Sequence, residues 1–170
     1  MDATTRELVE GLRSAMQGER TGHEFYKMAA ASTHDPAGKK VFEQLASEEL
    51  HHLDFLGRHQ QSLVETGKLS REAVLGKPGA LAGEHPIFSA RLKERIGGAH
   101  FEMSALAIAV QLELNGINHY RELAARARSP EARALFQQLV EWESGHYDAF
   151  VRQQQELQEA YWSEAGFSPF

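Results

Sequence analysis

The chain has 170 residues, with 18 Lys and Arg against 24 Asp and Glu, a formal net charge of −6, and no cysteine. This length suggests a single domain, 1–170, with room for a real core, and the acidic balance argues against a nucleic-acid partner. The lack of cysteine excludes disulfides, zinc–thiolate sites, iron–sulfur clusters and thiol catalysis. The first residues show no signal-peptide pattern, and no apolar run approaches the ~18 residues of a membrane span. We therefore expect a cytoplasmic protein with no membrane partner.

Four long amphipathic helices are predicted, because apolar residues recur at three- and four-residue steps in four segments. The expected helices cover about 5–32, 36–66, 99–127 and 130–158. Asp35 and Pro36 suit the N-cap and first helical position of the second helix. The turn through Ser129 and Pro130 precedes the fourth helix. Two short turns of this kind predict two antiparallel helical hairpins.

The two predicted hairpins are separated by residues 67–98, which are rich in Gly and Pro and lack a long period. We interpret this segment as a crossover with short helical pieces. One long connection between two hairpins is typical of the crossover form of an all-α four-helix bundle. The aromatic tail, 159–170, is expected to pack on the bundle or on a partner chain.

The second half of the chain repeats the first. One ungapped shift of 94 positions aligns identical residues on both pairs of helices. The central matched pairs are Glu19 with Glu113, Tyr26 with Tyr120, Pro36 with Pro130, Glu49 with Glu143, and His52 with His146. Chance is a poor explanation for a shared proline, two tyrosines and a Glu-x-x-His together, so an internal repeat is indicated.

The stretch "SEELHH" at 47–52 holds two overlapping Glu-x-x-His motifs, and the repeat selects one of them. Glu49 and His52 have counterparts in the second half and lie on the apolar stripe of their helix. Glu48 aligns with Trp142 instead, and His51 has no matching partner either. We therefore expect Glu49 and His52 to be the functional pair. Glu48 lies one turn before His52 and could orient an imidazole.

Each predicted helix carries one glutamate on its apolar stripe, and the second and fourth add a histidine. These candidate metal ligands are Glu19, Glu49, His52, Glu113, Glu143 and His146. Burying one unpaired carboxylate costs several kcal/mol, and four of them would also repel one another. Shared protons with raised pKa values are one remedy. Two divalent cations are a more economical one, and mixed oxygen and nitrogen ligands suit iron or manganese.

Other polar residues near the stripes are open to two interpretations. Tyr26 and Tyr120 either pack with their hydroxyls satisfied or donate hydrogen bonds to ligand carboxylates. His23 lies one turn after Glu19, but the repeat pairs it with an isoleucine, so we expect a half-buried histidine with its own partner. Three further histidines are expected at the surface: His51, His59 and His119.

These residues resemble the ferritin-like carboxylate-bridged di-iron proteins, in which two helices each give a Glu and two others each give Glu-x-x-His. The segments "ERTGHEFY" and "ELNGINHY", with "EELHH" and "ESGH", carry the resemblance over about 5–158. The rubrerythrin branch is the most similar, because both Glu-x6-Tyr segments are present. The resemblance implies two iron ions, with manganese as an alternative. Glu49 and Glu143 would bridge, Glu19 and Glu113 would be terminal, and His52 and His146 would each bind one metal.

The rubrerythrin resemblance implies reduction of hydrogen peroxide or dioxygen at the di-iron centre, in a homodimer. Whether the homodimer exchanges helices is left open by the sequence. Full-length rubrerythrins also carry a rubredoxin-like site with four cysteines, which this chain lacks. Electrons would therefore come from an external donor. One alternative is a ferroxidase that feeds iron storage. A third is a metal-stabilised bundle without turnover, which chelation would destabilise.

Overall fold

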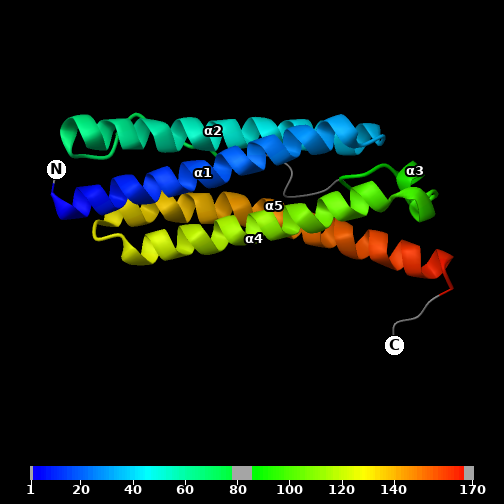
Figure 1. Ribbon diagram of the computed structural model, residues 1–170. Coiled ribbons are helices and arrows are strands. Elements are labelled where there is room, and N and C mark those ends of the chain that lie inside the picture. Colours follow the sequence, from blue (N-terminus) through cyan, green and yellow to red (C-terminus); the bar gives the residue numbers. More distant parts are fainter. Residues whose placement is uncertain (1, 78–85, 167–170) are drawn as a thin grey trace.

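The computed structural model describes residues 2–77 and 86–166, and its long helices lie side by side as a bundle (Figure 1). The long helices are α1 (Ala3–Ser32), α2 (Pro36–Thr66), α4 (His100–Arg126) and α5 (Pro130–Glu164). Helix α1 packs mainly against α2, and α4 packs mainly against α5. The described residues form no strand. The predicted all-α bundle of two antiparallel hairpins is thus confirmed, and three of the four helices end within two residues of their predicted bounds.

The two hairpins are joined by a crossover that runs along the bundle. Helix α2 ends and α4 begins at opposite ends of the molecule, so the connection must span its length (Figure 1). Two short helical pieces occur in it, α3 (Ala90–Lys93) and the 3-10 helix η2 (Ile96–Gly98). Part of the predicted crossover, 78–85, lies outside the described residues.

Local hydrogen bonds explain where the long helices begin. The Asp35 carboxylate accepts a hydrogen bond from the Gly38 amide at 2.8 Å, with Pro36 in the first turn. The Ser129 hydroxyl oxygen accepts one from the Ala132 amide at 3.1 Å, with a proline again in the first turn. Each cap satisfies an amide that the helix itself leaves unpaired. The two Glu-x-x-His helices therefore start at equivalent positions of the repeat.

The C-terminal helix is longer than the sequence predicted. Helix α5 continues to Glu164, so the assignment of 159–170 as a tail after the bundle is wrong for its first residues. The helix continues past residue 158 because Tyr161 packs against the buried core. Residues 159–165 contain no Gly or Pro, and the next residue, Gly166, has a φ of 63°. Positive φ is a conformation that glycine adopts without strain. The last predicted tail residues, 167–170, lie outside the described part.

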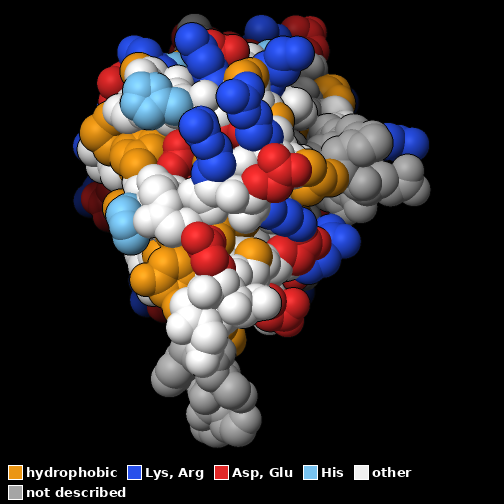
Figure 2. Space-filling model, turned by 90° about the vertical axis from the view of Figure 1, so that its right-hand side faces the viewer, with side chains coloured by type: hydrophobic (Ala, Val, Ile, Leu, Met, Phe, Trp, Pro, Cys, Tyr) orange, Lys and Arg blue, Asp and Glu red, His pale blue; other side chains and the backbone are white. Residues whose placement is uncertain are grey.

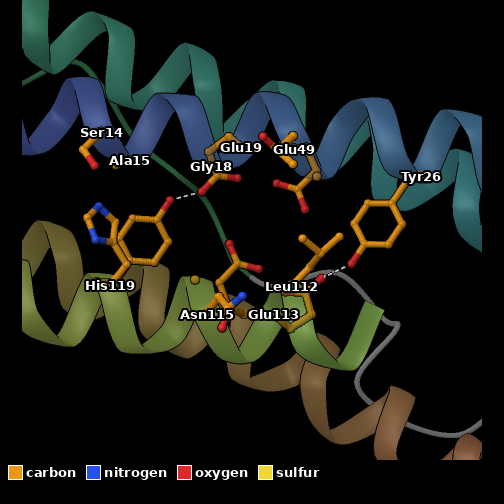
Figure 3. Close-up of a pocket in the computed structure, with 15 residues that line it drawn as sticks. Ser14, Ala15, Gly18, Glu19, Tyr26, Glu49, Leu112, Glu113, Asn115 and His119 are labelled. Carbon is orange, nitrogen blue, oxygen red and sulfur yellow. Dashed lines mark hydrogen bonds between the residues drawn. The ribbon is translucent and has the colours of Figure 1, made fainter. Parts of the chain in front are cut away.

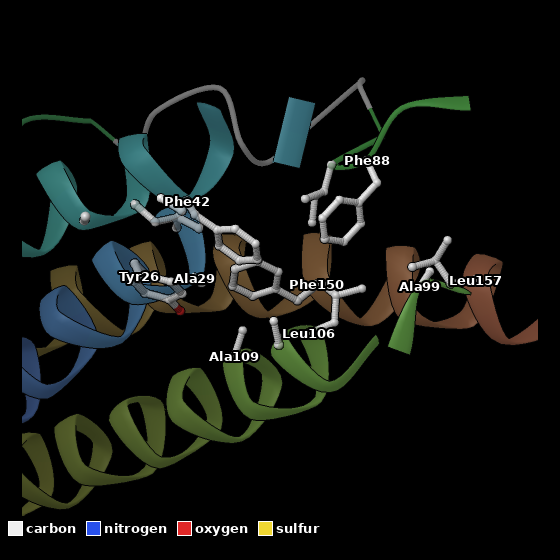
Figure 4. Close-up of a cluster of buried hydrophobic side chains, with 14 of the residues drawn as sticks. Tyr26, Ala29, Phe42, Phe88, Ala99, Leu106, Ala109, Phe150 and Leu157 are labelled. Carbon is white, nitrogen blue, oxygen red and sulfur yellow. The ribbon is translucent and has the colours of Figure 1, made fainter. Parts of the chain in front are cut away.

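Two apolar clusters fill the bundle. The first contains Tyr26, Phe42, Leu106 and Phe150 and extends toward the crossover (Figure 4). The second is built around Leu12, Leu56, Tyr120, Phe136 and Leu139. Along α1 the second cluster comes first and the first cluster comes last, with Glu19 between them. The candidate ligands thus occupy a polar layer with apolar packing on both sides, which keeps water from reaching them along the bundle axis.

Charged residues of both signs lie on the end of the bundle near α3, among apolar and uncharged ones (Figure 2). Figure 2 looks at this end and shows Lys and Arg side chains mixed with Asp and Glu. Charges of both signs are therefore interspersed on this face. Among the described residues, no helix combines the length and the apolar character that crossing a membrane requires.

Candidate metal centre

The six candidate ligands meet in the polar layer, and we call this group the polar cluster. Its members are Glu19 from α1, Glu49 and His52 from α2, Glu113 from α4, and Glu143 and His146 from α5. No member is more than 4% exposed to solvent. Residues 94 positions apart in sequence are thus brought to one site from both hairpins. Their spacing along each helix follows from the stripe that also buries the apolar clusters.

The polar cluster divides into two groups that could each hold a metal ion. In the first, His52 Nδ1 lies 3.1 Å from oxygens of Glu19 and Glu143 and 3.7 Å from Glu49. In the second, His146 Nδ1 lies 3.3 Å from Glu143 and 3.7 Å from Glu113. Within each group the ligand atoms lie within 4.8 Å of one another. Glu143 belongs to both groups, as a bridging carboxylate must, whereas Glu49 belongs to the first alone.

The two imidazoles lie in unusual electrostatic surroundings. Burial alone would lower the pKa of His52, but the carboxylates of Glu143 and Glu19 outweigh burial and raise its pKa well above the ordinary value. Burial would also lower the pKa of His146, but the carboxylates of Glu113 and Glu143 raise that pKa well above its ordinary value. A nitrogen lone pair that faces carboxylates repels them unless a cation lies between. A proton or a metal ion can fill this role.

The buried acids respond to one another as well. Burial and the charge of Glu143 raise the pKa of Glu113 to about 8. Burial and the charge of Glu19 raise the pKa of Glu49 well above its usual range. Burial would also raise the pKa of Glu143, but His52 and His146 beside it hold that pKa well below the ordinary value. Without metal, the raised pKa values of Glu49 and Glu113 therefore favour the protonated, neutral forms of these two acids.

Two tyrosines tie the hairpins together across the polar cluster (Figure 3). Tyr26 on α1 donates a hydrogen bond to Glu113 on α4, and Tyr120 on α4 donates one to Glu19 on α1. The arrangement is reciprocal, as the repeat requires. Of the two interpretations that the sequence left open, the structure shows the hydrogen-bonded one. Each phenol fixes the orientation of a carboxylate that the sequence predicts to be a terminal ligand.

A cavity of about 300 Å³ between α1 and α4 reaches the polar cluster. Its lining includes Glu19, Glu49, Glu113 and Tyr120. Figure 3 shows the three glutamate side chains around it. Gly22 keeps this space open, because a Cβ atom there would lie 3.1 Å from the Glu49 carboxylate. The cavity is large enough for a molecule of a few atoms and leads it directly to the carboxylates.

Glu48 is the residue whose place the sequence did not predict. It is buried, and its Oε2 lies 2.7 Å from Nε2 of His146 on the opposite hairpin. The sequence predicted that Glu48 could orient the imidazole of His52. This prediction is wrong about the partner, because Glu48 contacts the imidazole of His146 instead. Burial would raise the pKa of the Glu48 carboxyl group. Hydrogen bonds from His146 and Gln44 outweigh burial and hold that pKa below its ordinary value. A signal was present in the sequence, because the repeat aligns Glu48 with Trp142, a large apolar residue that favours a buried position.

The remaining histidines are mostly as expected. His23 is half-buried, with Nδ1 2.7 Å from the Ala46 carbonyl oxygen, so it has its own partner. His51 is exposed. The surface prediction is wrong for His59, which is 6% exposed because it packs edge-on against Phe55. It is also wrong for His119, which is half-buried because it lines the cavity between α1 and α4.

The polar cluster fits metal ions by its donor chemistry. Four carboxylates balance the charge of two divalent cations, and two neutral imidazoles complete a set of oxygen and nitrogen ligands. Each imidazole already presents Nδ1 to carboxylates of the same group. An all-α bundle with paired, buried Glu and His ligands on facing helices defines the ferritin-like class of carboxylate metal proteins.

Comparison with known families agrees with this class and narrows it. The family model for rubrerythrin matches residues 10–154, which include all six members of the polar cluster. The chain therefore belongs to the rubrerythrin family, as the sequence resemblance predicted. Neither the curated proteins nor the solved structures give a match to this chain.

Proposed function

We propose that this protein is a di-iron oxidoreductase that reduces hydrogen peroxide or dioxygen with electrons from an external donor. One observation carries the proposal: four buried carboxylates and two buried imidazoles meet in two groups that share Glu143. Membership of the rubrerythrin family supports iron as the metal. Manganese takes the same ligands and is the alternative ion.

The proposed ligands are the six members of the polar cluster, with His52 and His146 binding through Nδ1. Glu143, which belongs to both groups, would be shared by the two ions. The family resemblance would make Glu49 a second shared carboxylate, although the geometry places it in the His52 group alone. When bound, two ferrous ions supply one electron each, which with two protons reduce one hydrogen peroxide to two water molecules. The protein holds the ligand geometry, because Tyr26 and Tyr120 fix carboxylates from the opposite hairpin.

The cavity between α1 and α4 is the route by which a small substrate would reach the proposed ligands. It passes Gly22 and ends at the Glu19, Glu49 and Glu113 carboxylates. The apolar clusters on both sides of the polar layer would confine access to this approach. Hydrogen peroxide and dioxygen both fit a space of about 300 Å³.

Electron supply is the step that the chain leaves to a partner. The sequence contains no cysteine, so it cannot form the four-cysteine iron site that delivers electrons in full-length rubrerythrins. We propose a separate reductant that acts on the oxidised centre. A cytoplasmic homodimer remains our prediction for the location and assembly of the protein.

The proposal is tested on protein purified without added metal. Metal content per chain is measured first, and the anaerobically reduced protein is then mixed with peroxide or with air while absorbance is followed. We expect two irons per chain and faster oxidation by peroxide than by air. Particles that accumulate many irons per chain would support iron storage instead. Bound metal that ignores both oxidants would support a structural bundle.

A further inference from the structure

Each of the two ligand groups contains one histidine and shares Glu143, but the two groups differ in what contacts the outer nitrogen of the histidine. His146 Nε2 donates a hydrogen bond to Glu48 Oε2 at 2.7 Å. Nε2 of His52 is buried and has no hydrogen-bond partner among the described residues. The repeat places Trp142 where a second Glu48 would be, and this indole packs edge-to-face on His52 with ring centroids 5.1 Å apart.

The difference has a known chemical effect on a metal-binding imidazole. A carboxylate on the outer nitrogen fixes the tautomer that presents the other nitrogen to the metal, and it makes the imidazole more basic. Loss of such a partner typically lowers metal affinity by about 10–100-fold. An indole face offers no comparable acceptor for a proton.

Glu48 is itself held in place for this contact. Its other oxygen, Oε1, accepts a hydrogen bond from Gln44 Nε2 at 2.8 Å, one turn earlier on α2. The carboxylate is therefore bonded on both sides, to its own helix and to the opposite hairpin. A side chain fixed in this way holds the imidazole ring of His146 in one orientation.

We infer that Glu48 is a positioning residue for one metal position alone, the one served by His146, so that the two positions of the pair are chemically unequal. The inference rests on the proposed metal binding. The His52 group contains one carboxylate more, Glu49. The order in which the two positions bind metal therefore depends both on this extra carboxylate and on the contact of Glu48 with His146. The effect of Glu48 on the His146 position does not depend on that order.

Cobalt(II) ions provide a test that needs no turnover. The metal-free full chain is titrated with cobalt under nitrogen, with visible absorption and equilibrium dialysis as readouts. Glu48→Gln should weaken one of two bound ions by about 10–100-fold and leave the other unchanged. Glu43→Gln removes the same charge from an exposed position on α2 and should have no effect.

Single-histidine backgrounds assign the effect to a position. With His52→Ala, the added Glu48→Gln change should weaken the remaining cobalt by about 10–100-fold. With His146→Ala, the same addition should change nothing. Equal weakening in both backgrounds, or none in either, would overturn the inference.

Two further observations keep the test interpretable. If Glu48→Gln lowers the helix content of the metal-free protein, Gln44→Ala replaces it. The Gln44→Ala change loosens Glu48 without touching a ligand, so it should weaken cobalt binding at the His146 position by a smaller factor. Unchanged cobalt binding in this variant would contradict the inference. If the unchanged protein binds no cobalt, the proposed function fails as well. Two cobalt ions that are indifferent to Glu48 would remove only this inference.

Discussion

Tyr26 on α1 donates a hydrogen bond to Glu113 on α4, so a tyrosine of one hairpin holds a candidate metal ligand of the other. Tyr120 holds Glu19 in the reciprocal sense. Helices α1 and α4 make few other close contacts, because a cavity lies between them. These two hydrogen bonds therefore connect the hairpins at the point where the cavity reaches the polar cluster.

Tyr26→Phe should destabilise the metal-free protein by about 1–3 kcal/mol, because a buried carboxyl group loses its hydrogen-bond donor. Urea unfolding measures the change in free energy. Tyr120→Phe should have a similar effect, whereas Tyr147→Phe, at a half-buried position outside the polar cluster, should have little. A double-mutant cycle with Glu113→Gln isolates the pair. Additive effects of the two changes would show that the hydrogen bond contributes nothing.

Glu143→Gln should abolish the paired metal centre, because this carboxylate belongs to both ligand groups. Metal content after loading and dialysis measures the effect. Glu141→Gln, an exposed change on the same helix, should bind metal as the unchanged protein does. Retention of both ions by Glu143→Gln would rule out its bridging role.

Gly22→Ala and Gly18→Ala form a matched pair on α1. A Cβ at Gly22 would lie 3.1 Å from the Glu49 carboxylate, whereas a Cβ at Gly18 meets nothing within 4 Å. Alanine at the exposed Gly18 position should stabilise the helix by up to about 1 kcal/mol and leave metal binding unchanged. Alanine at Gly22 should displace Glu49 and weaken metal binding. Thermal unfolding and cobalt titration of both variants test this, and identical behaviour would contradict the role of Gly22.

The metal-free protein should lose stability as pH rises from about 5 to above 8. Folding raises the pKa of Glu113 from 4.5 to about 8 and also raises the pKa values of Glu49, His52 and His146. In this window the folded state binds more protons than the unfolded state, so the free energy of unfolding falls with increasing pH. Glu143, whose pKa is lowered, acts in the opposite sense only at acid pH.

Thermal unfolding across this pH range tests the linkage. For a chain of this size, each 1 kcal/mol lost lowers Tm by roughly 2–4 °C. Bound metal replaces the shared protons, so the loaded protein should keep its Tm as pH rises, and chelation should restore the decline. A metal-free Tm that is constant or increases between pH 5 and 8 would show that the acids do not share protons.

The sequence alone determined the bundle and the members of the polar cluster. Apolar spacing on four segments, the capped starts at Asp35 and Ser129, and the repeat are local or periodic signals, and each is set by helix geometry. The choice of Glu49 over Glu48 as the candidate ligand was also possible, because only Glu49 has a glutamate counterpart. The end of α5 was predicted too early, since the contact of Tyr161 with the core has no local signature.

Only the tertiary structure decided how the two hairpins face each other. That Glu48 contacts His146 rather than His52 depends on the distance between α2 and α5, which no spacing along one helix encodes. The same holds for the crossed tyrosine contacts and for the cavity beside Gly22. Periodicity tells which face of a helix is buried, but the partner of a buried polar atom is selected by packing between helices.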